Sequence, residues 1–321
     1  MKVLILGGGG VIGQKLAHSL ALRGELRGKE LTKIVLADIV NPPPVDAPVP
    51  VETTTCDIAN PASVAGCIDA DTDVIYVLAA IVSSHAEEDF DLGYKINMTG
   101  TINVLERARA LGTKPVVIFT SSLAVFGGEV PDPIVDHTFL NPQSSYGTQK
   151  AIGELLLTDY SRKGFVDGRG FRLPTISVRP GKPNRAASSF MSSILREPLN
   201  GQEAVCPVKE DFLHYYLSPR KCVENLIKGA EFAEEDLGQN RNMMMPGQIL
   251  SVRQLIDAMT SVVGPEPAKL IRWEPDAAIQ YIVEGWRYDQ APQKSIKLGL
   301  TADDSFEDNI RYYLEDDKPK S

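Results

Sequence analysis

Cysteine is scarce in this sequence, and the few thiols follow no metal-binding or redox pattern. The four cysteines among 321 residues are Cys56, Cys67, Cys206 and Cys222, and no two of them have CxxC or zinc-ligand spacing. A chain of this length buries a sizeable core without disulfide bonds. We therefore expect free, buried thiols in a reducing compartment, and we predict no metal site.

Long apolar runs and a positive charge balance are also missing. No stretch approaches the ~20 apolar residues of a membrane span, and the apolar run 3–6 is too short for a signal peptide. With 33 lysines and arginines against 42 aspartates and glutamates, the net charge is -9. This balance argues against nucleic acid or an anionic membrane as a partner, and the expected location is the cytoplasm.

What the sequence does contain is an alternation of apolar runs, typical of buried strands, with helical periodicity. We predict strands at residues 3–6, 33–38, 51–54, 74–78, 115–120 and 175–179. We predict helices at 11–23, 61–68, 91–111, 146–163, 219–233 and 252–263, and a proline-rich loop at 41–50. Strands that alternate with helices predict an α/β fold with a Rossmann-type, doubly wound parallel sheet.

A glycine-rich loop joins the first strand to the first helix. Gly7, Gly10 and Gly13 have the spacing G-x-x-G-x-x-G, and Val11 and Ile12 open the helix. Glycine permits the tight turn, the close approach of backbone to a pyrophosphate and the packing of helix on strand. The helix N-terminus then offers unpaired N–H groups to the phosphates. An ordinary flexible turn is the alternative, but the strand before and the helix after favour a dinucleotide site.

The ends of the next strands supply candidates for the rest of a dinucleotide. Asp38 ends the second strand, where a carboxylate can accept both ribose hydroxyls and repel a 2′-phosphate, so we predict NAD rather than NADP. A solvated strand-end aspartate is the alternative. Asp57 and Ile58 are candidate contacts to the adenine edge. The small Ala79 and Ala80 suit a place where backbone runs against a ribose.

Tyr146 and Lys150 open a predicted helix one turn apart, after a strand that ends in Ser121 and Ser122. A phenol titrates near pH 10, and a neighbouring ammonium together with a nicotinamide cation is expected to lower that pKa. Lys150 can also hold a cofactor ribose, and a serine hydroxyl can orient the substrate oxygen. The pattern predicts oxidation of an alcohol or reduction of a ketone on a nicotinamide cofactor. An ordinary surface helix pair is the alternative.

At this point the chain resembles the extended branch of the short-chain dehydrogenase/reductase family, the NAD-dependent epimerase/dehydratase group, over nearly its whole length. The segments that carry the resemblance are residues 7–13, Asp38, 57–58, 78–80, Asn97 in Asn-Met-Thr-Gly-Thr, 120–122, Tyr146 with Lys150, and 179–181. The resemblance implies that Ser122 and Tyr146 are catalytic, that Asn97 supports a buried proton relay beside the cofactor, and that the Arg-Pro-Gly turn lies beside the nicotinamide. It also implies a homodimer formed through helices around 99–111 and 151–163.

The substrate is less well determined. Nucleotide-sugar members of the family carry an arginine where this chain has Glu210, and a glutamate would repel a pyrophosphate. Arg179 and Lys182 suit a small carboxylate, and Ser83 with His85 is expected near the same mouth. Residues 83–95, 172–198 and 210–216 resemble a branch of the family that oxidises a four-carbon sugar acid at C2, which implies D-erythronate as substrate and 2-oxo-tetronate as product.

We therefore expect an NAD-binding domain at 1–179, to which 211–234 returns, and a mainly substrate-binding lobe at 180–321. The leading hypothesis is an NAD-dependent sugar-acid dehydrogenase. The alternative is a nucleotide-sugar epimerase or dehydratase that holds NAD tightly, and a third hypothesis is a non-catalytic NAD-sensing protein on the same fold. Accumulation of NADH distinguishes the first from the second, and retention of Tyr146 and Lys150 argues against the third.

Overall fold

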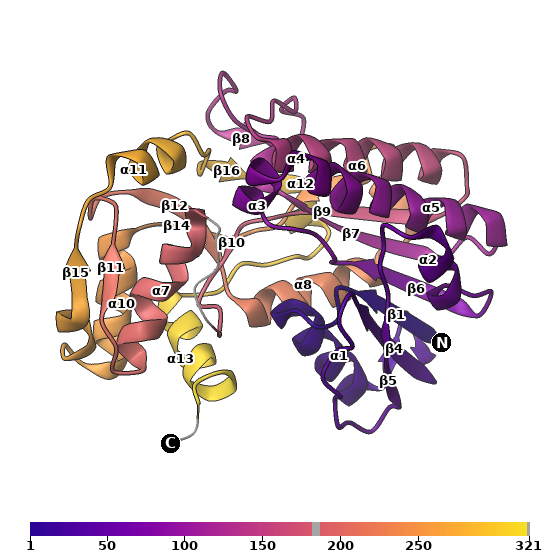
Figure 1. Cartoon of the computed structure of the whole chain (residues 1–321), viewed down its shortest axis with the longest axis horizontal. Coiled ribbons are helices and arrows are strands. Elements are labelled where there is room, and N and C mark those ends of the chain that lie inside the picture. Colours follow the sequence, from indigo (N-terminus) through magenta and orange to yellow (C-terminus); the bar gives the residue numbers. More distant parts are fainter. Residues whose placement is uncertain (182–186, 320–321) are drawn as a thin grey trace.

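The computed structural model describes residues 1–181 and 187–319. A parallel sheet with its covering helices forms the larger part of the molecule, on the right in Figure 1, and a smaller lobe lies on the left. Among the described residues, no helix has the length and apolar character needed to cross a bilayer.

The sheet has seven strands in the order β13-β9-β7-β6-β1-β4-β5, and each neighbouring pair is parallel. In chain order these are β1 (Lys2–Leu6), β4 (Lys33–Asp38), β5 (Val51–Thr55), β6 (Thr72–Val77), β7 (Val116–Ser122), β9 (Asp167–Leu173) and β13 (Asn242–Met244). In the sheet, β1 pairs with β4 on one side and with β6 on the other. The predicted doubly wound sheet is confirmed, and its switch point lies beside β1, where such sheets bind ligands at the carboxyl ends of the strands.

Helices cover both faces, and alternate residues of each strand face opposite layers. On one face, Val3 and Ile5 pack with α1 (Val11–Arg23) and α8 (Pro219–Glu231). On the other, Leu4 and Leu6 pack with the layer built from α2 (Pro61–Cys67), α5 (Gly100–Leu111) and α6 (Ser145–Arg162). The near-continuous apolar strands in the sequence are explained by this burial on both faces.

The predicted helix at 91–111 is divided into three elements. It consists of α4 (Phe90–Gly93), a π-helical turn (Tyr94–Thr99) and α5. Before it comes the short α3 (Ser83–Glu88). The π-helical turn contains the buried Asn97. Wide turns of this kind keep a helical sequence pattern, so periodicity alone did not indicate it, and they occur frequently at functional sites.

Strand β9 was missed by the sequence analysis, and the strand predicted at 175–179 is wrong. The sequence of β9, Asp-Gly-Arg-Gly-Phe-Arg-Leu, lacks the apolar run expected of a central strand. Both arginines are nevertheless buried, because Arg169 pairs with Asp167 and Arg172 pairs with Glu154. Only β10 (Thr175–Ile176) forms within the predicted strand, and it belongs to a separate sheet of order β10-β12-β14.

The lobe combines short strands with helices around a second apolar core. Its elements are α7 (Phe190–Leu199), β11 (Ala204–Cys206), β12 (Leu213–Leu217), β14 (Gln248–Ser251), α10 (Val252–Val263), β15 (Ile271–Trp273), α11 (Ala277–Glu284) and α13 (Phe306–Asp316). The remaining elements are β2 (Glu25–Leu26), β3 (Lys29–Glu30), β8 (Ile134–Val135), α9 (Glu234–Leu237), β16 (Gln290–Ala291) and α12 (Gln293–Lys297). Strand β13 joins the large sheet from a segment that the sequence analysis did not place there, and the two domain boundaries stay predictions.

Candidate active site

The glycine loop lies directly against the ends of two neighbouring strands. The backbone N–H groups of Gly7 and Gly8 donate to the carbonyl oxygen of Ala37, at 2.8 and 3.0 Å. A Cβ atom on Gly7 would lie 2.6 Å from the nitrogen of Ala79, and one on Gly13 would lie 2.5 Å from the carbonyl oxygen of Gly7. Both distances are too short for a side chain. The two glycines are therefore needed for the turn and for the packing of α1 on the sheet.

The N-terminus of α1 is open. Gly10 is the N-cap residue, no side chain among the described residues caps the first N–H groups, and the first turn contains no acidic residue. A Cβ atom on Gly10 would meet only the carbonyl oxygen of Gly7, at 3.5 Å, so this position does not face packed protein. Val11 and Ile12, which follow it, are half-buried. Unpaired N–H groups at such a helix end bind phosphate oxygens.

Asp38, at the end of β4, turns its carboxylate toward the glycine loop. Its Oδ2 accepts a hydrogen bond from the backbone N–H of Gly9 at 2.9 Å, and its Oδ1 accepts one from the N–H of Ile39 at 2.7 Å. These bonds fix the orientation of the carboxylate, and each oxygen retains a second acceptor position. The group is therefore placed to accept ribose hydroxyls beside the helix N-terminus.

Asp57 and Ile58 lie in the loop after β5. The Asp57 carboxylate accepts from the N–H of Ala59 at 2.9 Å. Ile58 is buried, and its carbonyl oxygen accepts from the side-chain amide of Asn103 on α5 at 2.9 Å. A Cβ atom on Gly100 would lie 2.7 Å from the Ile58 side chain. The Ile58 side chain therefore anchors this loop to α5, which is a packing role that the sequence analysis did not predict.

The strand end at Ala79 and Ala80 is held from both sides. The N–H of Ala79 donates to the carbonyl oxygen of Leu6 at 3.0 Å. Asn97 then binds both backbone groups of Ile81, accepting from its N–H at 2.9 Å and donating to its carbonyl oxygen at 3.2 Å. Asn97 also donates to Oε1 of the fully buried Gln149 at 2.7 Å. This amide pair fixes the loop beside the glycine turn, and no pattern in the sequence indicated the role of Gln149.

Ser122, Tyr146 and Lys150 come together at the carboxyl edge of the sheet. Ser122 ends β7, and its hydroxyl accepts from the N–H of Ala124 at 3.1 Å. The same hydroxyl lies close enough to the phenol of Tyr146 to act on its pKa. Lys150 donates to the carbonyl oxygen of Thr120 at 2.7 Å, and its ammonium lies 5.6 Å from the centroid of the Tyr146 ring. Helix α6 can approach this closely because Gly147 leaves no side chain between it and Ala124.

Burial governs the pKa of both titratable groups. It raises the pKa of the Tyr146 phenol to about 12, against the opposing effect of the hydrogen bond from Ser122. It lowers the pKa of Lys150 to about 8, against the attraction of the Glu154 carboxylate. Among the protein's own groups, burial is therefore the largest effect on the Tyr146 phenol. The expectation that Lys150 and a nicotinamide cation together lower this pKa stays a prediction.

The strand that pairs with β7 at Ser122 is β9, which ends before the Arg-Pro-Gly turn. Leu173, the last residue of β9, is directly paired with Ser122. The chain then runs to Thr175, whose hydroxyl lies 2.8 Å from Nε2 of the buried His214. Arg179 lies further on and is held at its backbone, with its N–H donating to Ser192 Oγ at 3.2 Å. The strand next to β7 ends six residues before Arg179, and the expected place of the Arg-Pro-Gly turn beside the nicotinamide stays a prediction.

The structure describes most of the residues that were predicted to contact substrate. Ser83 and His85 are half-buried on α3, and Glu87 of the same helix accepts from the N–H of Ser145 at 2.8 Å, so α3 is attached to the start of α6. Arg179 is half-buried as a residue, and the pKa of its guanidinium is lowered by burial and by the nearby Arg196. Lys182 lies outside the described residues.

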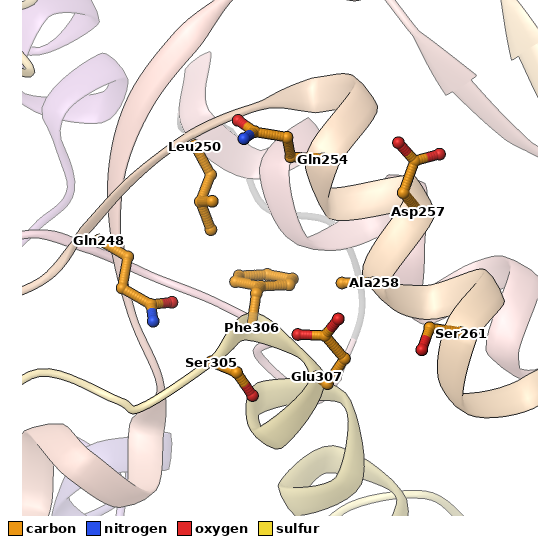
Figure 2. Close-up of a pocket in the computed structure, with 9 residues that line it drawn as sticks. All are labelled: Gln248, Leu250, Gln254, Asp257, Ala258, Ser261, Ser305, Phe306 and Glu307. Atoms are coloured by element: carbon orange, nitrogen blue, oxygen red, sulfur yellow. The ribbon is translucent and has the colours of Figure 1, made fainter.

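A separate hollow of about 520 Å³ lies in the lobe, away from these groups (Figure 2). Phe306 and Leu250 form its apolar part, and the side chains of Asp257 and Glu307 lie at its edge. Its walls come from β14, α10 and the start of α13. The hollow shares no residue with the glycine loop or with the group around Tyr146.

Comparison with known proteins agrees with this geometry. A model of the NAD dependent epimerase/dehydratase family matches residues 3–214. The chain belongs to this family. NAD is therefore its cofactor, and the residues fit it: the α1 N-terminus is open, Gly7 and Gly13 leave no room for a side chain, and Asp38 is oriented beside the loop.

Members of this family with close similarity cover nearly the whole chain. D-erythronate dehydrogenase of Cupriavidus necator is 47% identical over 320 residues, which is 98% of each chain. D-erythronate dehydrogenase of Haemophilus influenzae is 43% identical over 99% of this chain and 100% of its own. A solved structure described as the nucleoside-diphosphate-sugar epimerase from Agrobacterium tumefaciens has a TM-score of 0.94 and 47% identity, and the match covers 98% of this chain and 94% of that one.

Proposed function

We propose that this protein oxidises a small sugar acid at C2, with D-erythronate as the substrate and 2-oxo-tetronate as the product. The balanced reaction is D-erythronate + NAD⁺ → 2-oxo-tetronate + NADH + H⁺. The observation that carries the proposal is the meeting of Ser122, Tyr146 and Lys150 at the carboxyl ends of the strands, the same end of the sheet as the glycine loop, with β6 between them. The choice of substrate is supported by the names of the relatives that are 47% and 43% identical.

In this proposal Tyr146 accepts the proton of the C2 hydroxyl, and Ser122 holds that hydroxyl in line with the phenol. NAD⁺, when bound, supplies the hydride acceptor and a second positive charge. Lys150 contributes its ammonium, which favours the phenolate and offers donors to a ribose. Both charges are needed because burial raises the pKa of Tyr146 to about 12. A phenol with that pKa is a poor base near neutral pH.

The cofactor-binding residues follow from the same geometry. We assign the pyrophosphate to the loop and helix start, the adenosine ribose to Asp38 and the adenine edge to Asp57 and Ile58. Ala79 and Ala80 line the nearby backbone, and Asn97 supports them through Ile81. The loop residues assigned to the pyrophosphate are Gly7, Gly10, Val11, Ile12 and Gly13.

For the substrate we assign the carboxylate to Arg179 and, from the sequence alone, to Lys182. Ser83 is the proposed contact to a further hydroxyl. A half-buried guanidinium is suited to a carboxylate, because it presents paired donors and has lost part of its own hydration.

A second candidate is a nucleotide-sugar epimerase, because the solved structure with 47% identity carries that description. The argument from Glu210 against this function is weaker than the sequence suggested. Glu210 is exposed and is paired with Arg253 at 2.5 Å, so its charge is partly neutralised. The two functions therefore have to be separated by their products.

The test is a screen of purified protein with NAD⁺ against four- to six-carbon aldonic acids, read as NADH absorbance, with UDP-sugars in parallel. We expect NADH to accumulate in proportion to protein with D-erythronate and with few other acids. Interconversion of UDP-sugars without NADH would establish the epimerase instead. Absence of any turnover in both arms would refute both functions.

We also propose that the protein is a cytoplasmic homodimer. The four cysteines are buried and free, which suits a reducing compartment. Leu155 on α6 is 66% exposed, and α6 is joined to α5 by a hydrogen bond from Tyr160 to Glu106, so the two helices form one surface. Sedimentation should give a dimer for the wild type and a monomer for Leu155→Glu. A wild-type monomer would contradict the dimer.

A further inference from the structure

Three consecutive residues of β7 each contact a residue of α6, and the three helix residues are spaced one turn apart. The hydroxyl of Ser122 lies beside the phenol of Tyr146, and the carbonyl oxygen of Thr120 accepts from Lys150. The third pair is Ser121 and Glu154, with the serine hydroxyl donating to the carboxylate at 2.6 Å. Two of these pairs belong to the proposed mechanism, and the pair with Glu154 has no role in it.

Glu154 is a buried carboxylate with a buried partner. Only 1% of the Glu154 side chain is exposed, and only 4% of the Arg172 side chain is exposed. Arg172 Nε donates to Oε1 at 2.9 Å and Nη2 donates to Oε2 at 2.7 Å, and the guanidinium lies 4.9 Å from the centroid of the Phe126 ring. The partner is itself placed at the site, because Arg172 directly precedes Leu173, which pairs with Ser122.

We propose that Glu154 is a positioning residue that keeps the ammonium of Lys150 charged at the pH at which the enzyme works. This inference rests on the role given to Lys150 in the proposed function. Glu154 lies one helical turn beyond Lys150 on the same face of α6, and both side chains are buried. Its negative charge therefore acts on the ammonium through a region from which water is largely excluded. Arg172 and Ser121 hold the carboxylate there.

The charges around Lys150 support this assignment. Burial lowers the pKa of Lys150 to about 8, and the attraction of Glu154 acts in the opposite direction. An opposite charge within about 4–6 Å commonly moves a pKa by about 1–3 units. The positive charge of Arg172 is paired with the same carboxylate. Other charged groups on or against α6 have partners of their own: Glu87 is bonded to the backbone of Ser145, Glu106 to Tyr160, and Asp159 to Arg162.

The same strand provides a matched control. Asp167 and Arg169 form a second buried ion pair at the amino end of β9, with 9% and 0% of their side chains exposed. This pair binds the end of α8 through the carbonyl oxygen of Phe232. Removal of the Glu154 carboxylate or of the Asp167 carboxylate leaves a buried guanidinium without its ion-pair partner and destabilises the fold. Only removal of Glu154 should change the ionisation of Lys150.

The experiment measures the titration of Lys150 directly in Glu154→Gln, Asp167→Asn and wild type. Lysine is labelled with ¹³C at Cε, and the Lys150 resonance is assigned by its loss in Lys150→Met. We expect the titration midpoint to fall by about one pH unit or more in Glu154→Gln and to stay within a few tenths of a unit in Asp167→Asn. NADH affinity, measured by fluorescence, should weaken at correspondingly lower pH in Glu154→Gln alone.

Two further variants keep the test decisive. Glu154→Asp keeps the charge and should restore most of the wild-type midpoint. If Glu154→Gln does not fold, the double variant Glu154→Gln/Arg172→Met leaves no guanidinium unpaired, and its midpoint should again lie below that of the wild type. A wild-type midpoint in whichever of the two variants folds would overturn the proposal. Because these readouts need no turnover, absence of sugar-acid oxidation would refute the proposed function and leave this result standing.

Discussion

The carboxyl edge of the parallel sheet and the C-terminal lobe are built in different ways. At the edge, the candidate groups are fixed largely by backbone hydrogen bonds, as in the bonds to Asp38, Ile81 and Thr120. In the lobe, short strands are joined by an aromatic cluster around His214. The His214 ring centroid lies 5.6 Å from a ring centroid of Trp286, and the His214 ring is stacked on Phe212. We infer that the edge determines the hydride chemistry and the cofactor, and that the lobe determines which alcohol is accepted.

The largest effect should come from the phenol at the edge. Tyr146→Phe removes the proposed base and should lower kcat by about 10²–10⁴-fold. Because the phenyl ring remains, NADH affinity should stay within a few-fold of wild type. Steady-state kinetics and a fluorescence titration measure both. Tyr281→Phe, on an 82% exposed lobe residue, is the control. Loss of cofactor binding together with activity would make Tyr146 a structural residue.

Replacement of a glycine in the loop should affect the cofactor before the substrate. In Gly13→Ala the new Cβ would lie 2.5 Å from the carbonyl oxygen of Gly7, so α1 must move away from β1. We expect NADH affinity to fall by about tenfold or more, equivalent to about 1.4 kcal/mol. Gly66→Ala in α2, where the added atom meets nothing within 4 Å, is the matched control. Equal affinities in the two variants would contradict the proposed phosphate site.

Arg179 tests the side of the site that faces the lobe. Arg179→Met removes the proposed carboxylate partner, and loss of a charged hydrogen bond costs about 1.5–3 kcal/mol, or about 10–150-fold in KM for the sugar acid. The KM for NAD⁺ should remain close to that of the wild type. Arg253→Met removes an exposed arginine that pairs with Glu210 and should change neither constant. If the KM for the sugar acid and the KM for NAD⁺ rise together in Arg179→Met, this residue supports cofactor binding as well as substrate binding, and the proposed division between edge and lobe fails there.

Asp38 tests the cofactor preference of the edge. Asp38→Ala removes the carboxylate that we propose repels a 2′-phosphate, so the ratio of kcat/KM for NAD to that for NADP should fall by about tenfold. The substrate KM should not change. An unaltered ratio would remove Asp38 from the ribose site.

The smallest effect is a pH dependence of stability in the lobe. Burial lowers the pKa of His214 from 6.5 to about 3, so the unfolded chain binds a proton between these values that the folded protein does not. Stability therefore falls as the pH falls below about 6.5. From pH 7 to pH 5, His214 should account for about 2 kcal/mol of that loss. Urea unfolding of His214→Phe should show a pH dependence that is weaker by this amount. An identical dependence would indicate that His214 is protonated in the folded state.

The elements of both regions differ in how far the sequence predicted them. Strong periodicity predicted α1 and α10 with the observed bounds, and the glycine spacing predicted the turn at Gly7. Strand β9 was missed because its buried arginines are paired by Asp167 and by Glu154, a residue on another element. The local sequence of a strand does not show that a residue on another element will pair with its arginine. The fixed spacing of Tyr146, Lys150 and Glu154 was the one available signal for the buried carboxylate.

Transfer of hydrogen from C2 of the substrate is the most direct test of the central claim. The wild-type protein is incubated with NAD⁺ and D-erythronate that carries deuterium at C2, and the reduced cofactor is analysed by mass spectrometry. We predict that nearly every molecule of reduced cofactor contains one deuterium and that Tyr146→Phe yields almost none of this product. Reduced cofactor without deuterium, or none at all while UDP-sugars are interconverted, would contradict the account.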